Sequence, residues 1–392
     1  MPWTQTLTHL ARLLGQPAPA RDAAFSGVSK DTRTLRPGEL YVALRGENFD
    51  GDAFAAAAFA KGAAAALCRE PHAEGPCLLV PDPLAALQQF AAAHRAQHPI
   101  PIFALTGSCG KTTTKNLTAA LLATKLRVVS TQGNLNNDIG CPLSLLQMDA
   151  NTEMAVIEMG ANHAGEIALL CALAKPTEAA VTLVAPAHLE GFGSIENVAA
   201  AKAEIVTGLG GRGCFYVNVD NPWCARMADM HAGEKIYFGS HGDVALRSCA
   251  FDDANEMLLD IAPIGKIRLP LPVRALASNV LLAVAVGLRH GVTDFEEPLR
   301  AACQTTSRMK TIACGPITVL DDTYNANPAS MNAAIETLGR WNAGMKIAAL
   351  GSMLELGGTA AALHREMGAE AARQGVARLY AFGPNAADIV RS

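Results

Sequence analysis

The stretch IFALTGSCGKTTTKN, residues 102–116, decides how the rest of the sequence is interpreted. An apolar run leads into Gly107 and Gly110, and Lys111 with a helix-like segment follows. A phosphate-binding loop needs this order: a strand, a turn whose backbone amides point inward, a lysine for the phosphates, a hydroxyl for Mg²⁺ and a helix N-terminus. Leu105 stands where the pattern G-x-x-x-x-G-K-[ST] has its first glycine. The stretch predicts a nucleotide site with a differently shaped entry. The alternative is an ordinary glycine turn with an incidental Gly-Lys-Thr.

Length and composition limit the function classes. The 392 residues are enough for two or three domains that each bury a core. Half of the residues are hydrophobic and 17% are charged, which is typical of a compact soluble enzyme. The formal net charge is −4 and the pI is about 6.2, so no basic surface for nucleic acid is predicted.

The cysteines and the apolar segments predict a cytoplasmic protein. Ten cysteines stand singly without a C-x-x-C pair, which favours reduced thiols over a disulfide framework or a zinc site. The first residues, MPWTQTLTHLARLL, lack the features of a signal peptide. The stretches FAAAAFAKGAAAALC and NVLLAVAVGL are interrupted by Lys61 or too short to span a bilayer, and we interpret them as packed helices.

Alternating strand-like and helix-like segments predict an α/β protein of three domains, 1–97, 98–312 and 313–392. The first combines ELYVALRG and CLLVPD with the Ala-rich, helix-like DAFAAAAFAKGAAAA. In the second, the apolar runs IFALTG, MAVIEMG, AAVTLVAPAH and CFYVNVD alternate with helical stretches, as in a parallel sheet with crossovers. The third begins with GPITVLDDTYNANP and is a doubly wound, Rossmann-like pattern that stops at Ser392.

Three residues near the predicted nucleotide site carry possible chemistry. Glu158 ends an apolar strand at the crevice where open α/β sheets bind ligands, and its oxygens suit Mg²⁺. His188 follows the next strand in the same way. Lys202 lies in the apolar helix NVAAAKAEIV, where burial would lower its pKa and leave a nucleophilic amine. The alternatives are an ordinary loop carboxylate, a structural histidine and a surface lysine.

Together these motifs resemble the Mur ligase family of bacterial cell-wall synthesis. The resemblance runs through GVSKDTRTLRPGELYVALRGENFDG, LTGSCGKTTTKN, GNLNNDIGCPLSLL, VIEMGANHAGEI, AHLEGFGSIENVAAAKAEI, LPLP, DDTYNANPASMNAA and LGSMLELG. The family's loop is TG-x-x-GKT without the earlier glycine, so Leu105 is expected. The resemblance implies a three-domain fold with a small UDP-substrate domain, a central ATP-binding domain and an incomplete C-terminal domain.

The resemblance also implies an activity and its cofactors. Family members are ATP-dependent acid–amino-acid ligases that use Mg²⁺. The motifs GNLNNDIG, GANH and AHLEGFGS point to the member that joins D-Ala-D-Ala to UDP-MurNAc-tripeptide through an acyl phosphate. We expect these small molecules as partners, a monomer, and neither nucleic acid nor membrane insertion.

Site residues follow from the resemblance, position by position. It implies ATP contacts from Thr106, Gly107, Ser108, Gly110, Lys111, Thr112, Thr113, Asn279, Arg308 and Asp322. It implies metal ligands at Thr112, Glu158, His188 and Lys202, the last after carbamylation by CO₂, and catalytic roles for Lys111, Glu158, His188 and Lys202. It implies substrate contacts from Ser29, Asp31, Thr32, Arg33, Asn134, Asn136, Asn137, Tyr324, Asn325 and Asn327.

The sequence departs from the family's pattern in places. After LPLP the usual Gly-x-His-Asn-x-x-Asn run is replaced by VRALASNVLLA, in which only Asn279 matches. The arginine motif reads TTSRMK, Gly-Asp-Met has become Gly-Ser-Met at 351–353, and the chain stops before the family's last C-terminal strands. Two alternatives therefore remain open. One is an amide ligase for another acid, as in folylpolyglutamate synthase, and the other is a truncated or repurposed nucleotide-binding relative.

Overall fold

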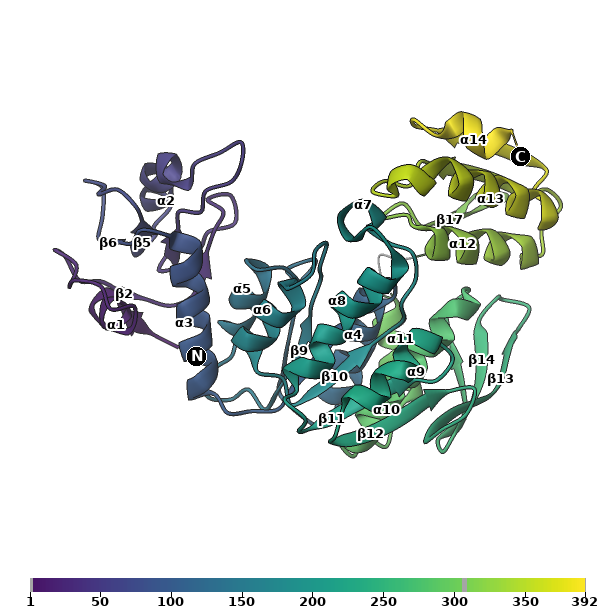
Figure 1. Cartoon of the computed structure of the whole chain (residues 1–392), viewed down its shortest axis with the longest axis horizontal. Helices are drawn as coiled ribbons and strands as arrows, with labels where there is room; N and C mark the ends of the chain where they lie inside the picture. The colour runs from purple at the N-terminus through teal and green to yellow at the C-terminus, as the bar shows by residue number, and fades with distance from the viewer. Residues whose placement is uncertain (1–2, 305–308, 392) are drawn as a thin grey trace. The chain divides into compact units, whose positions relative to one another are not determined.

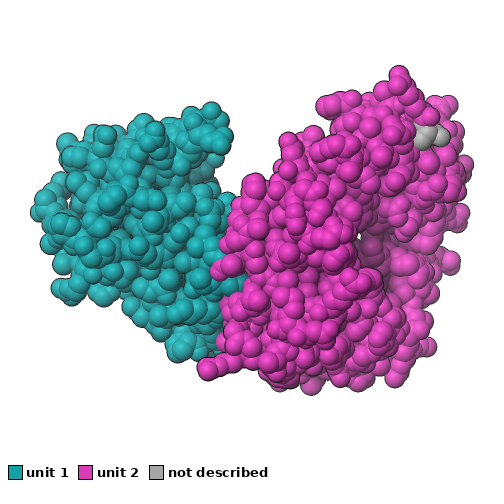
Figure 2. All heavy atoms as spheres, viewed as in Figure 1, with its two compact units in different colours: residues 1–102, 127–157, 169–175 teal, residues 103–126, 158–168, 176–392 magenta. Residues whose placement is uncertain are grey.

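The computed structural model describes residues 3–304 and 309–391. The chain divides into two compact units (Figure 2). Unit 1 contains residues 1–102, 127–157 and 169–175, and unit 2 contains 103–126, 158–168 and 176–392. The chain therefore passes between the units several times, and each unit is described by itself.

Unit 1 is built on a four-stranded parallel sheet in the order β3-β4-β5-β6. Its strands are β3 (Val28–Ser29), β4 (Leu40–Val42), β5 (Ala65–Cys68) and β6 (Cys77–Leu79). The 3-10 helix η1 (Gly51–Phe54), α2 (Ala55–Ala60) and α3 (Pro83–Gln97) accompany them, and β1 (Gln5–Thr6) and β2 (Ala24–Phe25) form an antiparallel pair next to α1 (Leu7–Leu13). The strands predicted in ELYVALRG and CLLVPD are confirmed.

The helix expected over DAFAAAAFAKGAAAA is wrong in its second half. Helix α2 ends at Ala60, Gly62 reverses the chain with a φ of +92°, and Ala65–Cys68 is strand β5. The residues of β5 are all fully buried between β4 and β6. Burial in the middle of the sheet overrides the helical preference of alanine.

The rest of unit 1 carries a second parallel pair. Strand β8 (Val128–Ser130) pairs with β9 (Met154–Glu158), and α5 (Gly140–Leu145) packs against α3. The buried Arg95 on α3 donates from Nε to the carbonyl of Ala174, 2.8 Å away, at the end of α6 (Glu166–Ala174). A buried guanidinium thus satisfies backbone carbonyls in this unit.

Unit 2 is built on a mixed sheet with the strand order β15-β14-β13-β12-β11-β10-β7. These strands are β7 (Ile102–Thr106), β10 (Glu178–Val181), β11 (Cys214–Asn218), β12 (Glu234–Gly239), β13 (Val244–Phe251), β14 (Met257–Ala262) and β15 (Gly265–Leu269). The pairs from β7 to β13 are parallel, as predicted, but β13, β14 and β15 are antiparallel. The link between β14 and β15 is only residues 263–264, which is too short for a parallel crossover.

Helices cover this sheet (Figure 1). The helices of this part of unit 2 are α4 (Lys111–Ala123), α7 (Leu189–Phe192), α8 (Ile195–Gly208), α9 (Pro222–Met227), η2 (Ala228–Met230), η3 (Arg274–Leu276), α10 (Ala277–Arg289) and α11 (Glu296–Gln304), of which α8, α9, α10 and α11 contact strands of the sheet. Helix α4, which begins at the predicted phosphate-binding loop, packs against α10 and α11. The segment NVLLAVAVGL is buried within α10, as predicted.

The last part of unit 2 has its own small core. A β16 (Lys310–Cys314) and β17 (Ile317–Asp321) hairpin is followed by α12 (Pro328–Arg340), β18 (Ile347–Gly351), η4 (Gly357–Thr359), α13 (Ala360–Arg373), β19 (Arg378–Phe382) and α14 (Ala386–Val390). Strands β18 and β19 are parallel, with α13 as the crossover, which confirms the predicted doubly wound pattern. Met331, Ile335, Met353 and Met367 pack together between the helices.

Two findings bear on the expectations from composition. All ten cysteines are free thiols. Among the described residues, the helices are too short or too polar to cross a bilayer.

Candidate active site

The phosphate-binding loop lies between β7 and α4, where two glycines are required by close contacts. Gly107 has a φ of +147°, and a Cβ there would lie 1.9 Å from Oγ1 of Thr182. Gly110 has a φ of +79° at the N-cap of α4, and its Cβ would lie 2.2 Å from Nδ2 of Asn279. The loop can take this shape only because both positions lack a side chain.

Hydrogen bonds fix the loop to the end of the neighbouring strand. The amide of Ser108 donates to the carbonyl of Leu183 at 2.9 Å, and the Ser108 hydroxyl donates to the carbonyl of Ala185 at 2.8 Å. Lys111 donates from Nζ to the carbonyl of Gly107 at 2.7 Å, so its ammonium lies over the loop. The predicted residues from Thr106 to Thr113 thus span the end of β7, the turn and the first turn of α4, and a helix N-terminus of this kind is suited to an anion.

Asn279 supports this loop from α10. Its side chain is 6% exposed and donates to the carbonyl of Gly110 at 3.3 Å and to the hydroxyl of Thr114 at 2.9 Å. The sequence predicts an ATP contact here, and the structure places the amide underneath the turn. Any effect of Asn279 on nucleotide binding would therefore be exerted at least partly through the position of the loop.

The side chains of Thr112 and Glu158 are hydrogen-bonded to each other beside the phosphate-binding loop. Glu158 ends β9, is 1% exposed, and its Oε1 accepts a hydrogen bond from the Thr112 hydroxyl at 3.3 Å. The amide of Met159 donates to the carbonyl of Leu105 at 2.8 Å, which holds the end of β9 beside β7. A hydroxyl and a carboxylate oxygen in contact are the hard donors that Mg²⁺ prefers, so these two residues fit the ion.

Lys202 is buried beside the same loop. It lies on α8, is 2% exposed, and donates from Nζ to the carbonyl of Ala161 at 3.2 Å. Burial, and next the positive charge of Lys111, lower the pKa of Lys202 to about 7. The amine is therefore substantially neutral near pH 7, as a nucleophilic role requires.

His188 contacts the segment LGSMLELG, residues 350–357. It caps the short helix α7 with a left-handed backbone (φ +53°), and its Nδ1 is in contact with Oε2 of Glu355. The amide of Glu190 also donates to the carbonyl of Glu355, at 3.0 Å. Glu355 was not predicted from the sequence, where it is only one acidic residue of LGSMLELG.

The segment DDTYNAN also reaches the loop. Asn327 caps α12, and its side-chain amide lies 2.9 Å from the sulfur of Cys109 in the phosphate-binding loop. Asp322 accepts from the amide of Met309 at 3.3 Å, and Tyr324 and Asn325 are exposed. The contact of Cys109 was missed because nothing local in the sequence links positions 218 residues apart. Arg308 lies outside the described residues.

The predicted UDP-substrate residues form a turn in unit 1. Ser29 ends β3, Asp31 accepts from the amide and guanidinium of Arg33 at 2.7–3.1 Å, and Thr32 lies between them. Hydrogen bonds from Arg33 lower the pKa of Asp31 to about 2. The guanidinium of Arg33 is 86% exposed and is thus oriented by Asp31 while facing solvent.

The predicted muramoyl-peptide residues also belong to unit 1. They lie in the loop before α5, where Asn137 accepts from the amide of Gly140 at 2.9 Å. Asn134 and Asn137 are exposed, and Asn136 is half-buried. The amide of Asn136 donates to the carbonyl of Asn134 at 2.8 Å, which gives this loop a tight local turn.

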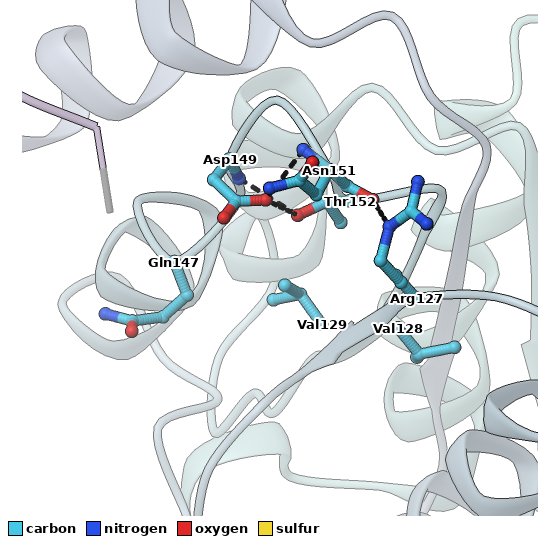
Figure 3. A pocket seen from close by; sticks show the side chains of 7 residues that line it. All are labelled: Arg127, Val128, Val129, Gln147, Asp149, Asn151 and Thr152. Carbon is cyan, nitrogen blue, oxygen red and sulfur yellow. Dashed lines mark hydrogen bonds between the residues drawn. The ribbon is translucent and has the colours of Figure 1, made fainter. Parts of the chain in front are cut away.

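A cavity of about 420 Å³ in unit 1 lies next to β8 (Figure 3). Its lining residues are Arg127, Val128, Val129, Gln147, Asp149, Asn151 and Thr152. Asp149 accepts from the amide of Asn151 and the hydroxyl of Thr152, so the polar groups are used in closing their own turn. None of these residues belongs to the predicted site.

Three regions of the chain match descriptions of one family. Residues 24–95 match "Mur ligase family, catalytic domain", 105–287 match "Mur ligase middle domain", and 307–392 match "Mur ligase, glutamate ligase domain".

Individual relatives match most of this chain. The UDP-N-acetylmuramoyl-tripeptide–D-alanyl-D-alanine ligase of Escherichia coli K12 is 37% identical over 96% of this chain and 86% of its own length. The enzyme of the same name from Bacillus subtilis is 36% identical over 91% of this chain and 80% of its own length. A crystal structure of MurF from Acinetobacter baumannii superposes with a TM-score of 0.89 at 30% identity, covering 99% of this chain and 88% of that one. MurF from Thermotoga maritima in complex with ADP gives 0.80 at 27% identity, covering 93% and 86%.

Proposed function

The chain belongs to the Mur ligase family, and from this premise we propose that it joins D-Ala-D-Ala to UDP-MurNAc-tripeptide. It is an ATP-dependent acid–amino-acid ligase of peptidoglycan precursor synthesis. The predicted family resemblance and the three-domain α/β fold are confirmed. The main structural support for this function is the phosphate-binding loop around Lys111, with Glu158 and Lys202 beside it. The chain is also similar to these ligases over almost its whole length.

We further propose the three-domain division at 1–97, 98–312 and 313–392. The three matched family regions lie within or close to these ranges. In this division, the first domain holds the UDP-substrate through Ser29, Asp31, Thr32 and Arg33. The loop with Asn134, Asn136 and Asn137 faces the muramoyl peptide.

The reaction we propose has two balanced steps. The terminal carboxylate oxygen of the tripeptide attacks the γ-phosphorus of ATP, and ADP leaves, so that an acyl phosphate forms. The free amine of D-Ala-D-Ala then attacks the acyl carbon, loses a proton, and inorganic phosphate leaves. Lys111 and the loop amides bind the phosphates and oppose the repulsion between carboxylate and triphosphate. Asn279 holds the loop, Arg308 and Asp322 contact the nucleotide, and Tyr324, Asn325 and Asn327 border the dipeptide.

Mg²⁺ is proposed as the metal cofactor. Thr112 and Glu158 would hold it, with His188 and a carbamylated Lys202 completing the metal sites. When bound, the ion neutralises phosphate charge and orients the reacting oxygens. The neutral Nζ of Lys202 suits carbamylation, because the amine attacks CO₂ and loses a proton, which leaves an anionic carbamate. Because Nδ1 of His188 contacts Glu355, Nε2 would be the ring nitrogen offered to the metal.

We propose that the protein acts in the cytoplasm as a monomer on these small molecules, without nucleic acid as a partner. Its substrates are soluble nucleotide and dipeptide species, and the net charge of −4 offers no general attraction to polyanions. Size-exclusion chromatography with light scattering would test the monomer.

The function is tested by a substrate panel. The 392-residue protein is mixed with ATP, Mg²⁺, D-Ala-D-Ala and UDP-MurNAc-tripeptide, and phosphate release and product mass are followed. We expect phosphate only when all components are present, and a nucleotide product with the mass of the pentapeptide. Replacing UDP-MurNAc-tripeptide and D-Ala-D-Ala by a folate and glutamate should give no product. Turnover on the folate pair alone, or nucleotide binding without any ligation, would support the alternatives instead.

A further inference from the structure

Three side chains suited to transition metals meet at one edge of the four-stranded sheet in unit 1. Asp52, Cys68 and His72 each offer one ligand atom, and these atoms all lie within 4.8 Å of one another. Cys68 ends β5, Asp52 lies in η1, and His72 lies in the loop between β5 and β6. None of them belongs to the predicted ligase site.

Cys77 adds a fourth donor. It pairs with Ala66 in the β5–β6 register, so it lies diagonally across from Cys68, two residues further along β5 and on the same face. The Cys77 sulfur lies 3.9 Å from the carbonyl of His72, the residue that carries the imidazole. A second thiol beside the cluster completes a sulfur-rich donor set of the kind that a thiophilic cation prefers.

Arg69 orients the carboxylate of Asp52. Its amide donates to Oδ1 at 3.1 Å, while Nε and Nη2 donate to Oδ2 at 3.0 and 2.7 Å. Oδ1 also faces Nε2 of His72 at 3.5 Å. The Asp52–Arg69 ion pair accounts for the burial of Asp52, but it does not account for the two thiols and the imidazole beside it. Hydrogen bonds of this kind commonly fix a metal-ligating carboxylate.

One side of the cluster is dry and the other has access to solvent. Cys68 is fully buried against a core that includes Tyr41, Ala55 and Ala66. The side chain of His72 is 17% exposed, which leaves a path for an ion. Zinc ligands lie roughly 3–4 Å apart around the ion, so the ligand atoms of Asp52, Cys68 and His72 need to close by only about 1 Å.

We propose that Asp52, Cys68, His72 and Cys77 bind a thiophilic divalent cation, with Zn²⁺ as the expected ion. Two sulfurs, one imidazole and one carboxylate in tetrahedral arrangement are typical zinc donors, and poor donors for Mg²⁺. The ion displaces the thiol protons and fixes the loop of residues 69–76 to the sheet. The spacing C-x₃-H-x₄-C at 68–77 contains no C-x-x-C pair, which is why the sequence favoured no zinc site. This inference does not depend on the ligase function.

The test is a Co²⁺ titration of the full chain, since tetrahedral cobalt thiolate has characteristic visible bands. The protein is reduced with a phosphine, and excess Mg²⁺ occupies hard-cation sites. We expect one equivalent of Co²⁺ with thiolate bands, and Zn²⁺ should displace it. Cys77→Ser and His72→Gln should each weaken binding at least about tenfold. Asp52→Asn should weaken binding less.

Matched controls use residues outside the cluster. Cys314→Ser removes an exposed thiol and His241→Ala an exposed imidazole, and both should bind Co²⁺ as the wild type does. Circular dichroism in the absence of metal verifies that His72→Gln and Cys77→Ser are folded. Absence of thiolate bands in the wild type, or bands unchanged in both folded variants, would overturn the site.

Discussion

Glu178 and Lys202 are two buried ionisable residues of unit 2, and their surroundings differ. Glu178, at the start of β10, accepts from the Tyr216 hydroxyl at 2.5 Å and pairs with His290 at 2.8 Å. Arg289 lies 3.5 Å away. Burial opposes ionisation of Glu178, but His290, Tyr216 and Arg289 together outweigh it and keep its pKa below the ordinary value. Lys202 donates to the carbonyl of Ala161. Burial and the positive charge of Lys111 outweigh the attraction of Glu166 and Glu204, and the pKa of Lys202 falls to about 7.

The difference separates a stabilising charge from a reactive one. Where a buried charge has matched partners, it is retained and contributes to the fold. Where nearby charges compensate burial only in part, the charged form is disfavoured, which costs stability but produces a neutral amine at physiological pH. We infer that the region around Glu178 serves stability and that around Lys202 serves chemistry.

The largest effect is expected at the phosphate-binding loop. Lys111→Ala should lower ligase turnover at least about a hundredfold, because a preorganised positive charge next to the transferred phosphate is lost. The fold should persist, since Lys111 is only half-buried at the first position of α4 and is not part of the hydrophobic core. Steady-state phosphate release and circular dichroism measure the two quantities. A folded variant with wild-type turnover would contradict the assignment of the loop.

Lys202→Met should abolish most activity and yet stabilise the protein. Below about pH 7 the lysine is protonated in both states, so the full cost of burying its charge is present. Between pH 7 and about 10.5 only the unfolded state holds the proton, so wild-type stability rises with pH. The gain from Met should therefore be greatest at or below pH 7, on the order of a few kcal/mol, and shrink toward pH 10.

Urea unfolding of Lys202→Met and the wild type in CO₂-free buffer at several pH values measures this gain. Lys61→Met, at an exposed position, is the control and should show no such trend. A destabilised Lys202→Met at pH 7 would mean that the amine is compensated after all.

Glu178→Gln should show the opposite behaviour. Loss of the charge facing His290 and Arg289 should lower stability by about 1–3 kcal/mol at pH 7, while turnover per folded molecule stays near wild type. Because the folded-state pKa of Glu178 is lowered, its contribution is present above the ordinary value of about 4.5 and is lost as pH falls through the folded-state pKa. The two proteins should become similar in stability once the pH is below the folded-state pKa of Glu178. Equal stability at pH 7 would refute the stabilising role.

Tyr216→Phe should give the smallest effect. It removes one hydrogen bond to Glu178 and keeps the ring packed against Phe103, so about 1 kcal/mol of stability should be lost. Thermal unfolding of this variant, with Glu178→Gln and the double variant, gives the coupling between the two residues. Strictly additive losses would show that the hydroxyl acts independently of the carboxylate.

Local sequence predicted the parts of the fold that depend on local order. The run from Ile102 to Asn116 specifies a strand, a turn and a helix by itself, and the structure has all three. By contrast, the buried strand Ala65–Cys68 looks helical by composition, and only its place in the middle of a sheet makes it extended. The antiparallel strands β13 to β15 were also missed, because the last apolar run from which a strand of this domain was predicted, CFYVNVD, ends before them.

The site could be predicted less completely. Glu158 and Lys202 were identified because they follow or line apolar segments of the nucleotide-binding region. The contact of Cys109 with Asn327, and that of His188 with Glu355, join segments far apart in the sequence. The supporting position of Asn279 under Gly110 depends on how α10 packs on α4, which no periodicity reveals.

The most direct test of the account is the fate of one oxygen atom. The terminal carboxylate of UDP-MurNAc-tripeptide is labelled with ¹⁸O, and the released phosphate is analysed by mass spectrometry after reaction with ATP and D-Ala-D-Ala. If the carboxylate attacks the γ-phosphorus, one labelled oxygen appears in phosphate for each fully labelled carboxylate converted to amide, and ADP is the other product. Unlabelled phosphate accompanying the amide product, or AMP and pyrophosphate, would contradict the acyl-phosphate mechanism.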